Sequence, residues 1–412
     1  MYWYQLSEEQ IKSKVFSALR QNINFGDDPI LGIPATYLDK KVFYDNEPFL
    51  ERAPFLSTLV ANPNHIGCHT LTESEKFFGG TQQLEKEVIS ICAEQIFGAS
   101  PNGYDGYIAS GGTEANIEGL WIFRNYFRHT FAAQYEEMAM VFSEDSHYSM
   151  PKGSDLLHVD AIVLPVDRQT RMIDEIRAGE LIDEAKQKGK KYFLVVANCS
   201  TTMFGTTDDT EVLGKLFESR NLEYMMHVDG AFGGFFYPFT ATENQYSFKN
   251  PRIQSITIDA HKLLQAPYGT GIFLARKGLI NHVRTEAAQY VQGMDHTLIG
   301  SRSGANAIAI WMVLHAYGSE GWKNKMVELK ERTDRTCRAL DKIGIRYVRN
   351  PFMNIIAIFA GQFPDAIAMK YHLVSNSWEG KTEFWKIVVM DHVKESELEA
   401  FVQEVQKTIA HA

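Results

Sequence analysis

Residues 255–271 read Ser-Ile-Thr-Ile-Asp-Ala-His-Lys-Leu-Leu-Gln-Ala-Pro-Tyr-Gly-Thr-Gly, and the apolar run 272–275 follows directly. The stretch begins as a β-rich segment, reaches the pair His261-Lys262, and passes through a turn rich in Pro and Gly into a second strand. Burial between strands lowers the pKa of a lysine, as Schiff-base chemistry with a carbonyl requires. Taken alone, Lys262 fits a solvated lysine at a strand end better, because most lysines are exposed.

The composition is that of an ordinary globular protein with a negative charge. Of 412 residues, 45% are hydrophobic and 22% charged, and the formal net charge is −10, which argues against nucleic-acid binding. The four cysteines form no C-x-x-C pair, so they indicate neither a zinc site nor a disulfide framework and fit a reducing compartment. With no signal-peptide pattern and no apolar run of membrane-spanning length, we expect a cytoplasmic protein without a membrane partner.

Up to and including residues 255–271, short apolar strands alternate with helices. Strands are expected at 106–109, 138–142, 161–164, 192–197, 225–228 and 256–258. This alternation predicts an α/β fold with a mostly parallel sheet and helices on both faces. Ligands of such sheets bind at the carboxyl ends of strands. The polar residues that follow these strands include Ser110, His147, Asp229 and Lys262.

Helical periodicity and weaker strands complete the domain plan. Helices are expected at 7–21, with Ser7 as N-cap, and at 81–97, 305–316, 321–343 and from about 396. Short strands near 355–359 and 385–390 indicate a small α+β C-terminal domain. We therefore divide the chain into an N-terminal helix and arm (1–55), a large domain (56–304) and a small domain (305–412).

Three local patterns carry candidate chemistry. In 110–113 (SGGT), backbone N–H groups at a helix start would bind a phosphate, although the GxGxxG and P-loop spacings are absent. Asp229 ends a strand, and a buried carboxylate there needs a cation such as a pyridinium nitrogen or several donors; an aspartate that caps a turn fits equally well. His65 and His69 lie without a carboxylate or thiol framework, so we expect a substrate-pocket or structural loop and no metal.

Five motifs then occur in order: 110–116 (SGGTEAN), His147, 227–231 (HVDGA), 259–262 (DAHK) and 300–304 (GSRSG). Together they resemble the group II pyridoxal-phosphate-dependent amino acid decarboxylases, in particular the tyrosine/aspartate and histidine decarboxylase-like branches, over about residues 60–395. The resemblance implies the fold type I architecture of pyridoxal-phosphate-dependent transferases (aspartate aminotransferase-like), bound pyridoxal 5'-phosphate, and a homodimer with shared active sites.

The resemblance also implies roles for single residues toward the cofactor. Lys262 would carry it as a Schiff base, and Asp229 would pair with its pyridine nitrogen. The ring would lie between Ala231 and His147, and Thr201 would lie near the ring hydroxyl or the substrate carboxylate. The phosphate would be held by a set comprising Ser110, Gly112, Thr113, His261, Ser301 and Arg302.

Further residues are assigned to substrate binding and proton transfer. His65, Asn198 and Lys386 would contact the substrate. Many relatives carry arginine where this chain has Lys386, and a lysine keeps the charge but loses the bidentate fork. Tyr290 would donate the proton to Cα, with a core or interface tyrosine as the alternative. Ser200 stands where the family more often has glycine.

These residues predict decarboxylation of an L-amino acid at Cα, giving the amine and CO₂, with an aromatic, histidine-like or acidic substrate. One alternative is a carbon–carbon lyase of the sphingosine phosphate lyase type. An N-terminal membrane segment would favour this alternative, and none is visible. The other is an inactive cofactor-binding scaffold, against which the intact Asp229 and Lys262 argue.

Overall fold

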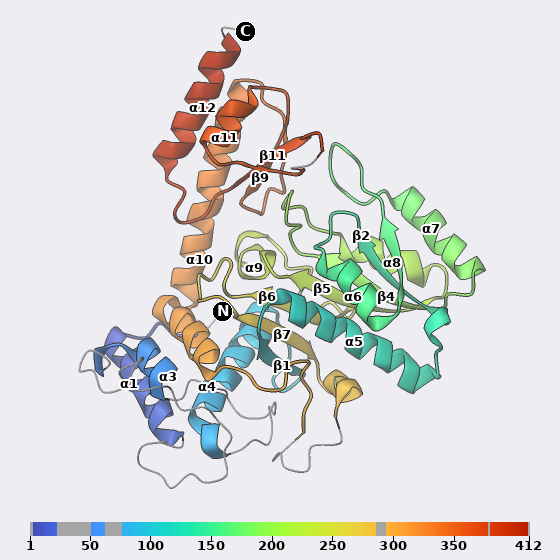
Figure 1. The fold of residues 1–412 in the computed structure, drawn as a ribbon, viewed down its shortest axis with the longest axis vertical. Coiled ribbons are helices and arrows are strands. Elements are labelled where there is room, and N and C mark those ends of the chain that lie inside the picture. The colour runs from blue at the N-terminus through green and yellow to red at the C-terminus, as the bar shows by residue number, and fades with distance from the viewer. Residues whose placement is uncertain (1–2, 23–50, 62–75, 286–293, 378–379, 411–412) are drawn as a thin grey trace.

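The computed structural model describes residues 3–22, 51–61, 76–285, 294–377 and 380–410 (Figure 1). Its main sheet has seven strands in the order β1-β7-β6-β5-β4-β2-β3. Their bounds are β1 Tyr104–Ala109, β2 Met138–Ser143, β3 Asp160–Leu164, β4 Tyr192–Asn198, β5 Glu223–Gly230, β6 Ile253–Asp259 and β7 Gly271–Arg276. Within this sheet β7 alone runs opposite to the other six strands, so the predicted mostly parallel α/β sheet is confirmed.

Helices cover both faces of this sheet, which explains why its strands read as continuous apolar runs. Successive residues of one strand point to opposite faces: Met140 packs in a core with Leu120 and Phe123, whereas Val141 packs in a second core with Ile182. The helices of the first face are α5 (Gly112–Phe131) and α6 (Ser149–Leu157), and those of the second include α4 (Gly79–Ser90), α7 (Glu175–Gln187) and α8 (Thr210–Glu218).

The helical predictions hold at both ends of the chain. Helix α1 (Glu8–Gln21) begins at the predicted N-cap Ser7, whose hydroxyl accepts from the backbone of Gln10 in a capping box. The helix expected at 81–97 is α4 followed by a π-helical turn, Ile91–Ile96. The helices expected at 305–316 and 321–343 are two parts of α10 (Gly304–Lys342), broken at Gly318, whose φ of 62° leaves the helical region.

The C-terminal elements form a second, smaller unit of one sheet covered by helices. A four-stranded antiparallel sheet has the order β10-β11-β9-β8, and α11 and α12 pack on one of its faces around Trp385 and Phe401. Figure 1 shows α10 running from beside the main sheet to this smaller one. The bounds are β8 Tyr347–Val348, β9 Ile355–Phe359, α11 Asp365–Lys370, β10 Val374–Ser375, β11 Phe384–Val388 and α12 Glu395–Ala410.

Short helices link these parts. They are α3 (Pro54–Ala61), η2 (Lys76–Phe78), η4 (Tyr135–Glu137), η5 (Gly233–Phe235), α9 (Tyr237–Thr240) and η6 (Leu279–Val283). In the described ranges, no helix combines the length and the apolar character that crossing a membrane requires.

Candidate active site

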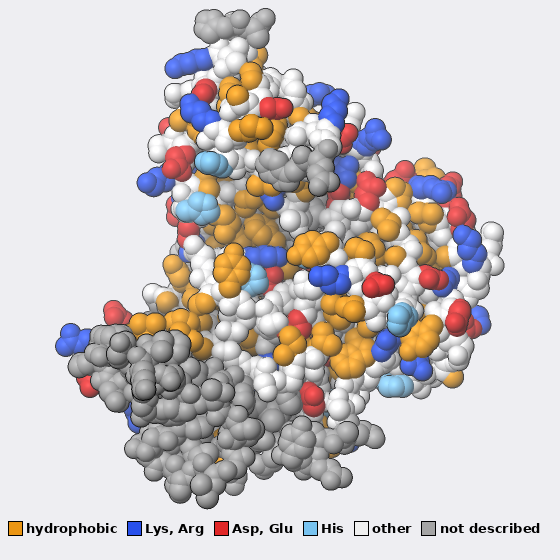
Figure 2. All heavy atoms as spheres, viewed as in Figure 1, with side chains coloured by type: hydrophobic (Ala, Val, Ile, Leu, Met, Phe, Trp, Pro, Cys, Tyr) orange, Lys and Arg blue, Asp and Glu red, His pale blue; other side chains and the backbone are white. Residues whose placement is uncertain are grey.

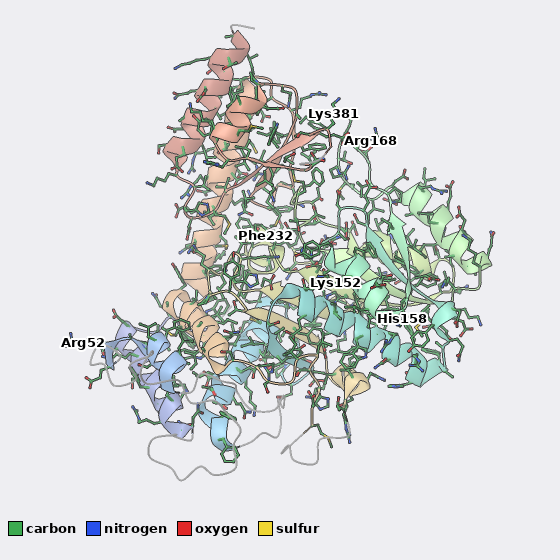
Figure 3. The ribbon with its side chains drawn as sticks, viewed as in Figure 1. Arg52, Lys152, His158, Arg168, Phe232 and Lys381 are labelled. Atoms are coloured by element: carbon green, nitrogen blue, oxygen red, sulfur yellow. The ribbon has the colours of Figure 1, made fainter. Side chains whose placement is uncertain are left out.

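The predicted site residues gather at the carboxyl ends of the parallel strands, as expected for an α/β sheet. Ser110 follows β1, Asp229 is the penultimate residue of β5, and Lys262 comes three residues after the end of β6. Figure 3 labels Phe232, which follows Ala231, and Lys152 of α6, which both flank this edge of the sheet.

Lys262 faces a carboxylate at the end of its own strand. Its Nζ lies 3.2 Å from Oδ2 of Asp259, and Nε2 of His261 lies 3.6 Å from the same oxygen. Burial raises the pKa of Asp259, and the charges of Lys262 and His261 oppose that rise. The ring of His261 stacks on Tyr268 with centroids 5.3 Å apart. Residues 259–262 therefore form a compact cluster of one acidic and two basic side chains.

Asp229 is buried and is held by neutral donors. Nδ2 of Asn116 donates to its Oδ2 at 2.9 Å, and the backbone N–H of Ala231 donates to its Oδ1 at 3.1 Å. Among the residues that the structure describes, no Lys, Arg or His forms an ion pair with it. A buried carboxylate with only neutral donors is suited to a cationic ligand such as a protonated ring nitrogen.

His147 lies within electrostatic reach of both clusters. Burial lowers its pKa; the carboxylates of Asp229 and Asp259 oppose this shift, and Lys262 adds to it. Its Nδ1 accepts the backbone N–H of Ser149 at 3.2 Å and lies 2.9 Å from the hydroxyl of that residue. The neutral imidazole therefore carries its proton on Nε2.

The Gly-Gly turn leaves a free helix start beside this cluster. Within the described ranges, no side chain caps the first turn of α5, so its backbone N–H groups and dipole favour an anion. A Cβ on Gly112 would lie 2.7 Å from Oδ2 of Asp259 and 3.1 Å from Cβ of Ala231, so only glycine fits. Thr113 is the next helical residue, and the backbone N–H of Ser110 donates to Glu114 at 2.6 Å.

The loop after β4 is fixed by internal hydrogen bonds. Nδ2 of Asn198 donates to Ser146 at 2.8 Å and to Asp208 at 2.7 Å, and Oγ1 of Thr201 lies 2.8 Å from Oγ1 of Thr206. Burial raises the pKa of Asp208 to about 6. Ser200 adopts a φ of 88°, a left-handed conformation that favours glycine, which accounts for the glycine expected there.

Two predicted residues come from farther along the chain. Lys386 of β11 donates to the carbonyl of Thr202 at 3.1 Å, and its pKa is lowered by burial and by the charge of Lys262, so the C-terminal sheet brings this ammonium toward the site. Arg302 is buried in an ion pair with Glu85 and donates to the carbonyl of Ile108. Ser301 beside it is exposed. The structure thus joins Arg302 to Glu85, and its role at the phosphate stays a prediction.

His65 and Tyr290 lie outside the described residues, so their assigned roles stay predictions. Among the residues that are described, no group of three or more His, Cys, Asp or Glu side chains is arranged to hold a metal. The sequence motifs predicted no role for Asn116 and Asp259, although Asn116 lies in the motif 110–116 and Asp259 in the motif 259–262. Asn116 follows Gly112 by four residues, so it lies on the same face of α5, and this spacing could have revealed it.

The residues fit pyridoxal 5'-phosphate by their chemistry. The uncapped start of α5 suits the phosphate, Asp229 lacks a cation that the ring nitrogen would supply, and Lys262 offers an amine for the aldehyde. Gly112 leaves space that any side chain would fill.

Comparison with known proteins identifies the family. The family described as "Pyridoxal-dependent decarboxylase conserved domain" matches residues 64–344. A tryptophan decarboxylase of Clostridium sporogenes is 44% identical over 98% of this chain and 97% of its own length. A probable L-tyrosine/L-aspartate decarboxylase of Methanocella arvoryzae is 31% identical, covering 86% and 92%.

A solved structure shares the fold. The L-methionine decarboxylase of Streptomyces sp. 590 superposes with a TM-score of 0.69 at 19% identity, covering 95% of this chain and 92% of that one. This likeness supports the fold type I architecture predicted from the motifs. Since the family match spans more than half of the chain, the protein belongs to the pyridoxal-dependent decarboxylase family.

Proposed function

We propose that the protein decarboxylates an aromatic L-amino acid, with tryptophan as the foremost candidate, to the corresponding amine and CO₂. The observation that carries this choice is the 44% identity with a tryptophan decarboxylase along almost the whole of both chains. Two relatives with other named substrates are less similar, at 31% identity for a probable L-tyrosine/L-aspartate decarboxylase and 28% for a histidine decarboxylase.

Bound pyridoxal 5'-phosphate supplies an electron sink for the pair released when the bond between Cα and the carboxylate breaks. The buried Asp229 holds a proton at the ring nitrogen, because a cation there compensates its charge. Lys262 Nζ binds the cofactor aldehyde, and the first turn of α5 with Ser110, Gly112 and Thr113 binds the phosphate, together with His261. Ala231 and His147 orient the ring from its two faces.

The remaining residues act on the substrate. The ammonium of Lys386 orients the substrate carboxylate, and its position near Lys262 supports this role. Thr201 and Asn198 shape the loop beside it through their bonds to Thr206, Ser146 and Asp208. We retain His65 as a substrate contact and Tyr290, 28 residues after Lys262, as the proton donor to Cα. The placement of Ser301 and Arg302 at the phosphate is a proposal that rests on the motif 300–304.

We also propose that the enzyme works as a cytoplasmic homodimer with shared sites. Large apolar side chains are exposed next to the site: Tyr148 is 66% exposed and Tyr268 is 90% exposed. Figure 2 shows hydrophobic side chains gathered across the middle of this face. Exposed apolar clusters of this kind mark interaction surfaces. Sedimentation equilibrium of the holoenzyme should give twice the chain mass; the mass of one chain would refute the dimer.

A substrate screen tests the activity. The purified holoenzyme is incubated with each of the twenty amino acids, and CO₂ and amine are both measured. The highest kcat/KM is expected for tryptophan, with tyrosine and phenylalanine next and with aspartate and histidine far lower. A preference for aspartate or histidine would overturn the choice of substrate. Cleavage of a carbon–carbon bond in a phosphorylated amino alcohol without CO₂ release would favour the lyase alternative.

A further inference from the structure

The side-chain amide of Asn116 lies at the centre of a buried network that joins both sides of the site. Its Nδ2 donates to Oδ2 of Asp229 at 2.9 Å and to Oγ of Ser149 at 3.1 Å, and its Oδ1 lies 2.9 Å from Nε2 of His227. Asn116 is 1% exposed and projects from the second turn of α5. One amide therefore joins α5 to two residues of β5, His227 and Asp229, and to Ser149 of α6.

The orientation of this amide follows from the chemistry of its partners. An ionised carboxylate only accepts hydrogen bonds, so the NH₂ group must face Asp229 and the oxygen must face His227. The His227 ring must then donate from Nε2, which leaves Nδ1 to accept the hydroxyl of Ser255 at 2.7 Å. Burial lowers the pKa of His227 to about 4, so the ring stays neutral and keeps this tautomer.

The second hydrogen of the Asn116 amide connects it through Ser149 to His147. Because Ser149 Oγ accepts from Asn116, its own hydroxyl hydrogen is free for Nδ1 of His147, 2.9 Å away. Nδ1 of His147 also accepts the backbone N–H of Ser149, so both contacts require Nδ1 to be unprotonated. The hydroxyl of Ser149, which Asn116 orients, and the backbone N–H of Ser149 thus both favour the proton of His147 on Nε2.

The fold makes room for this network. Gly119 lies three residues after Asn116 on α5, and a Cβ there would lie 2.6 Å from Nδ1 of His227 and 3.0 Å from Oγ of Ser255. His227 also has Oγ1 of Thr257 at 3.3 Å from Nε2. Gly119, Ser255, Thr257 and Asn116 thus surround the His227 ring. The fixed ring in turn holds the Asn116 amide in one orientation.

We propose that Asn116 is a positioning residue that couples Asp229 to His147, fixing the carboxylate for the ring nitrogen and the Nε2–H tautomer of the histidine through one amide. The inference rests on the proposed function, because it takes these two residues as the partners of the cofactor. It adds that their geometries are not independent: a change at Asn116 alters both, whereas a change at Ser149 alters only the histidine arm.

The test uses histidine-selective ¹⁵N NMR of the cofactor-free protein together with equilibrium binding of pyridoxal 5'-phosphate. In the parent protein, both His147 and His227 should appear as Nε2–H tautomers. Asn116→Leu should give His147 a mixture of tautomers and should raise the cofactor Kd at least about tenfold, because a hydrogen bond to a charged group is lost. Ser149→Ala should give the same mixture at His147 with a cofactor Kd within about threefold of the parent.

Asn354→Leu is the matched control, because Asn354 is also a fully buried amide but bonds to Val389 in the C-terminal sheet. It should leave the tautomers and the Kd unchanged. A single Nε2–H tautomer at His147 together with a parent-like Kd in Asn116→Leu would overturn the proposal. If Asn116→Leu does not fold, an unchanged His147 tautomer in Ser149→Ala overturns it equally. The tautomers are read without turnover, so failure of the decarboxylase assay is a separate result.

Discussion

Nζ of Lys262 lies 3.2 Å from Oδ2 of Asp259, three residues before it, in a pair where the carboxylate is buried and the ammonium is partly exposed. Asp259 has its other oxygen, Oδ1, buried without a partner among the described residues. The charge of this aspartate therefore acts mainly on Lys262 and His261, which are its ion-pair neighbours. In the cofactor-free protein this ion pair holds Nζ of Lys262 beside the carboxylate of Asp259.

Replacing Asp259 with asparagine should consequently speed cofactor uptake near neutral pH. The substitution removes the ion pair that holds Nζ of Lys262 beside position 259, so the amine is freer to reach the cofactor aldehyde. The measurement is the rate at which visible absorbance develops when pyridoxal 5'-phosphate is added to cofactor-free protein at several pH values. Asp105→Asn is the control, since Asp105 lies away from the site. Its Oδ1 lies 2.6 Å from Nζ of Lys277. A rate equal to or below that of the parent contradicts the expectation.

Lys386 should govern substrate affinity more than turnover. Lys386→Met removes the ammonium that we assign to the substrate carboxylate, and KM should rise by about 10- to 100-fold while kcat changes little. Lys386→Arg keeps the charge and should restore most of the affinity. Lys381→Met, which alters an exposed lysine on the same part of the chain (Figure 3), should behave like the parent. A loss confined to kcat would remove Lys386 from carboxylate binding.

Arg302 should stabilise the fold even without cofactor. Its guanidinium and Glu85 form a buried ion pair, so Arg302→Met leaves an unpaired buried carboxylate and should lower the free energy of unfolding by about 3–5 kcal/mol. The double variant Glu85→Leu with Arg302→Met should recover most of that loss, because two apolar residues replace the pair. Urea unfolding of the cofactor-free protein measures both. Should Arg302→Met weaken only cofactor binding, the arginine belongs to the phosphate site.

His227 should make stability depend on acid pH. Its folded pKa of about 4 lies below the usual 6.5, so the unfolded chain binds the proton more readily and acidification destabilises the fold. Between pH 7 and pH 5 this amounts to about 2 kcal/mol. The free energy of unfolding of the parent should therefore fall by about that much more than that of His227→Gln over this interval. Equal slopes for the two proteins would disprove the assignment.

The sequence reveals most of the fold because its strands are continuous apolar runs, such as 192–197, and its helices carry start signals, such as Ser7. The site is harder to predict, since its contacts join distant positions. Lys386 meets Thr202 across 184 residues, and Arg302 meets Glu85 across 217. The motif 110–116 contains Asn116, but its partner Asp229 lies 113 residues away, and only the folded sheet brings the two together.

Ser200 illustrates what a local departure from a family pattern can reveal. A serine where glycine is more frequent still adopts a φ of 88°, so the backbone keeps the conformation that glycine favours. The π-helical turn Ile91–Ile96 has no comparable signal, because its residues follow the same apolar spacing as the α-helix before it.

We infer that Lys262 and the cofactor together release CO₂ from an aromatic amino acid. The most direct test measures CO₂ and amine from tryptophan with the parent holoenzyme and with Lys262→Ala, each supplied with pyridoxal 5'-phosphate. We expect equal amounts of CO₂ and amine from the parent, and no release above the protein-free background from Lys262→Ala. Sustained CO₂ release by Lys262→Ala, or a parent enzyme that yields no CO₂ from any amino acid, would contradict this account.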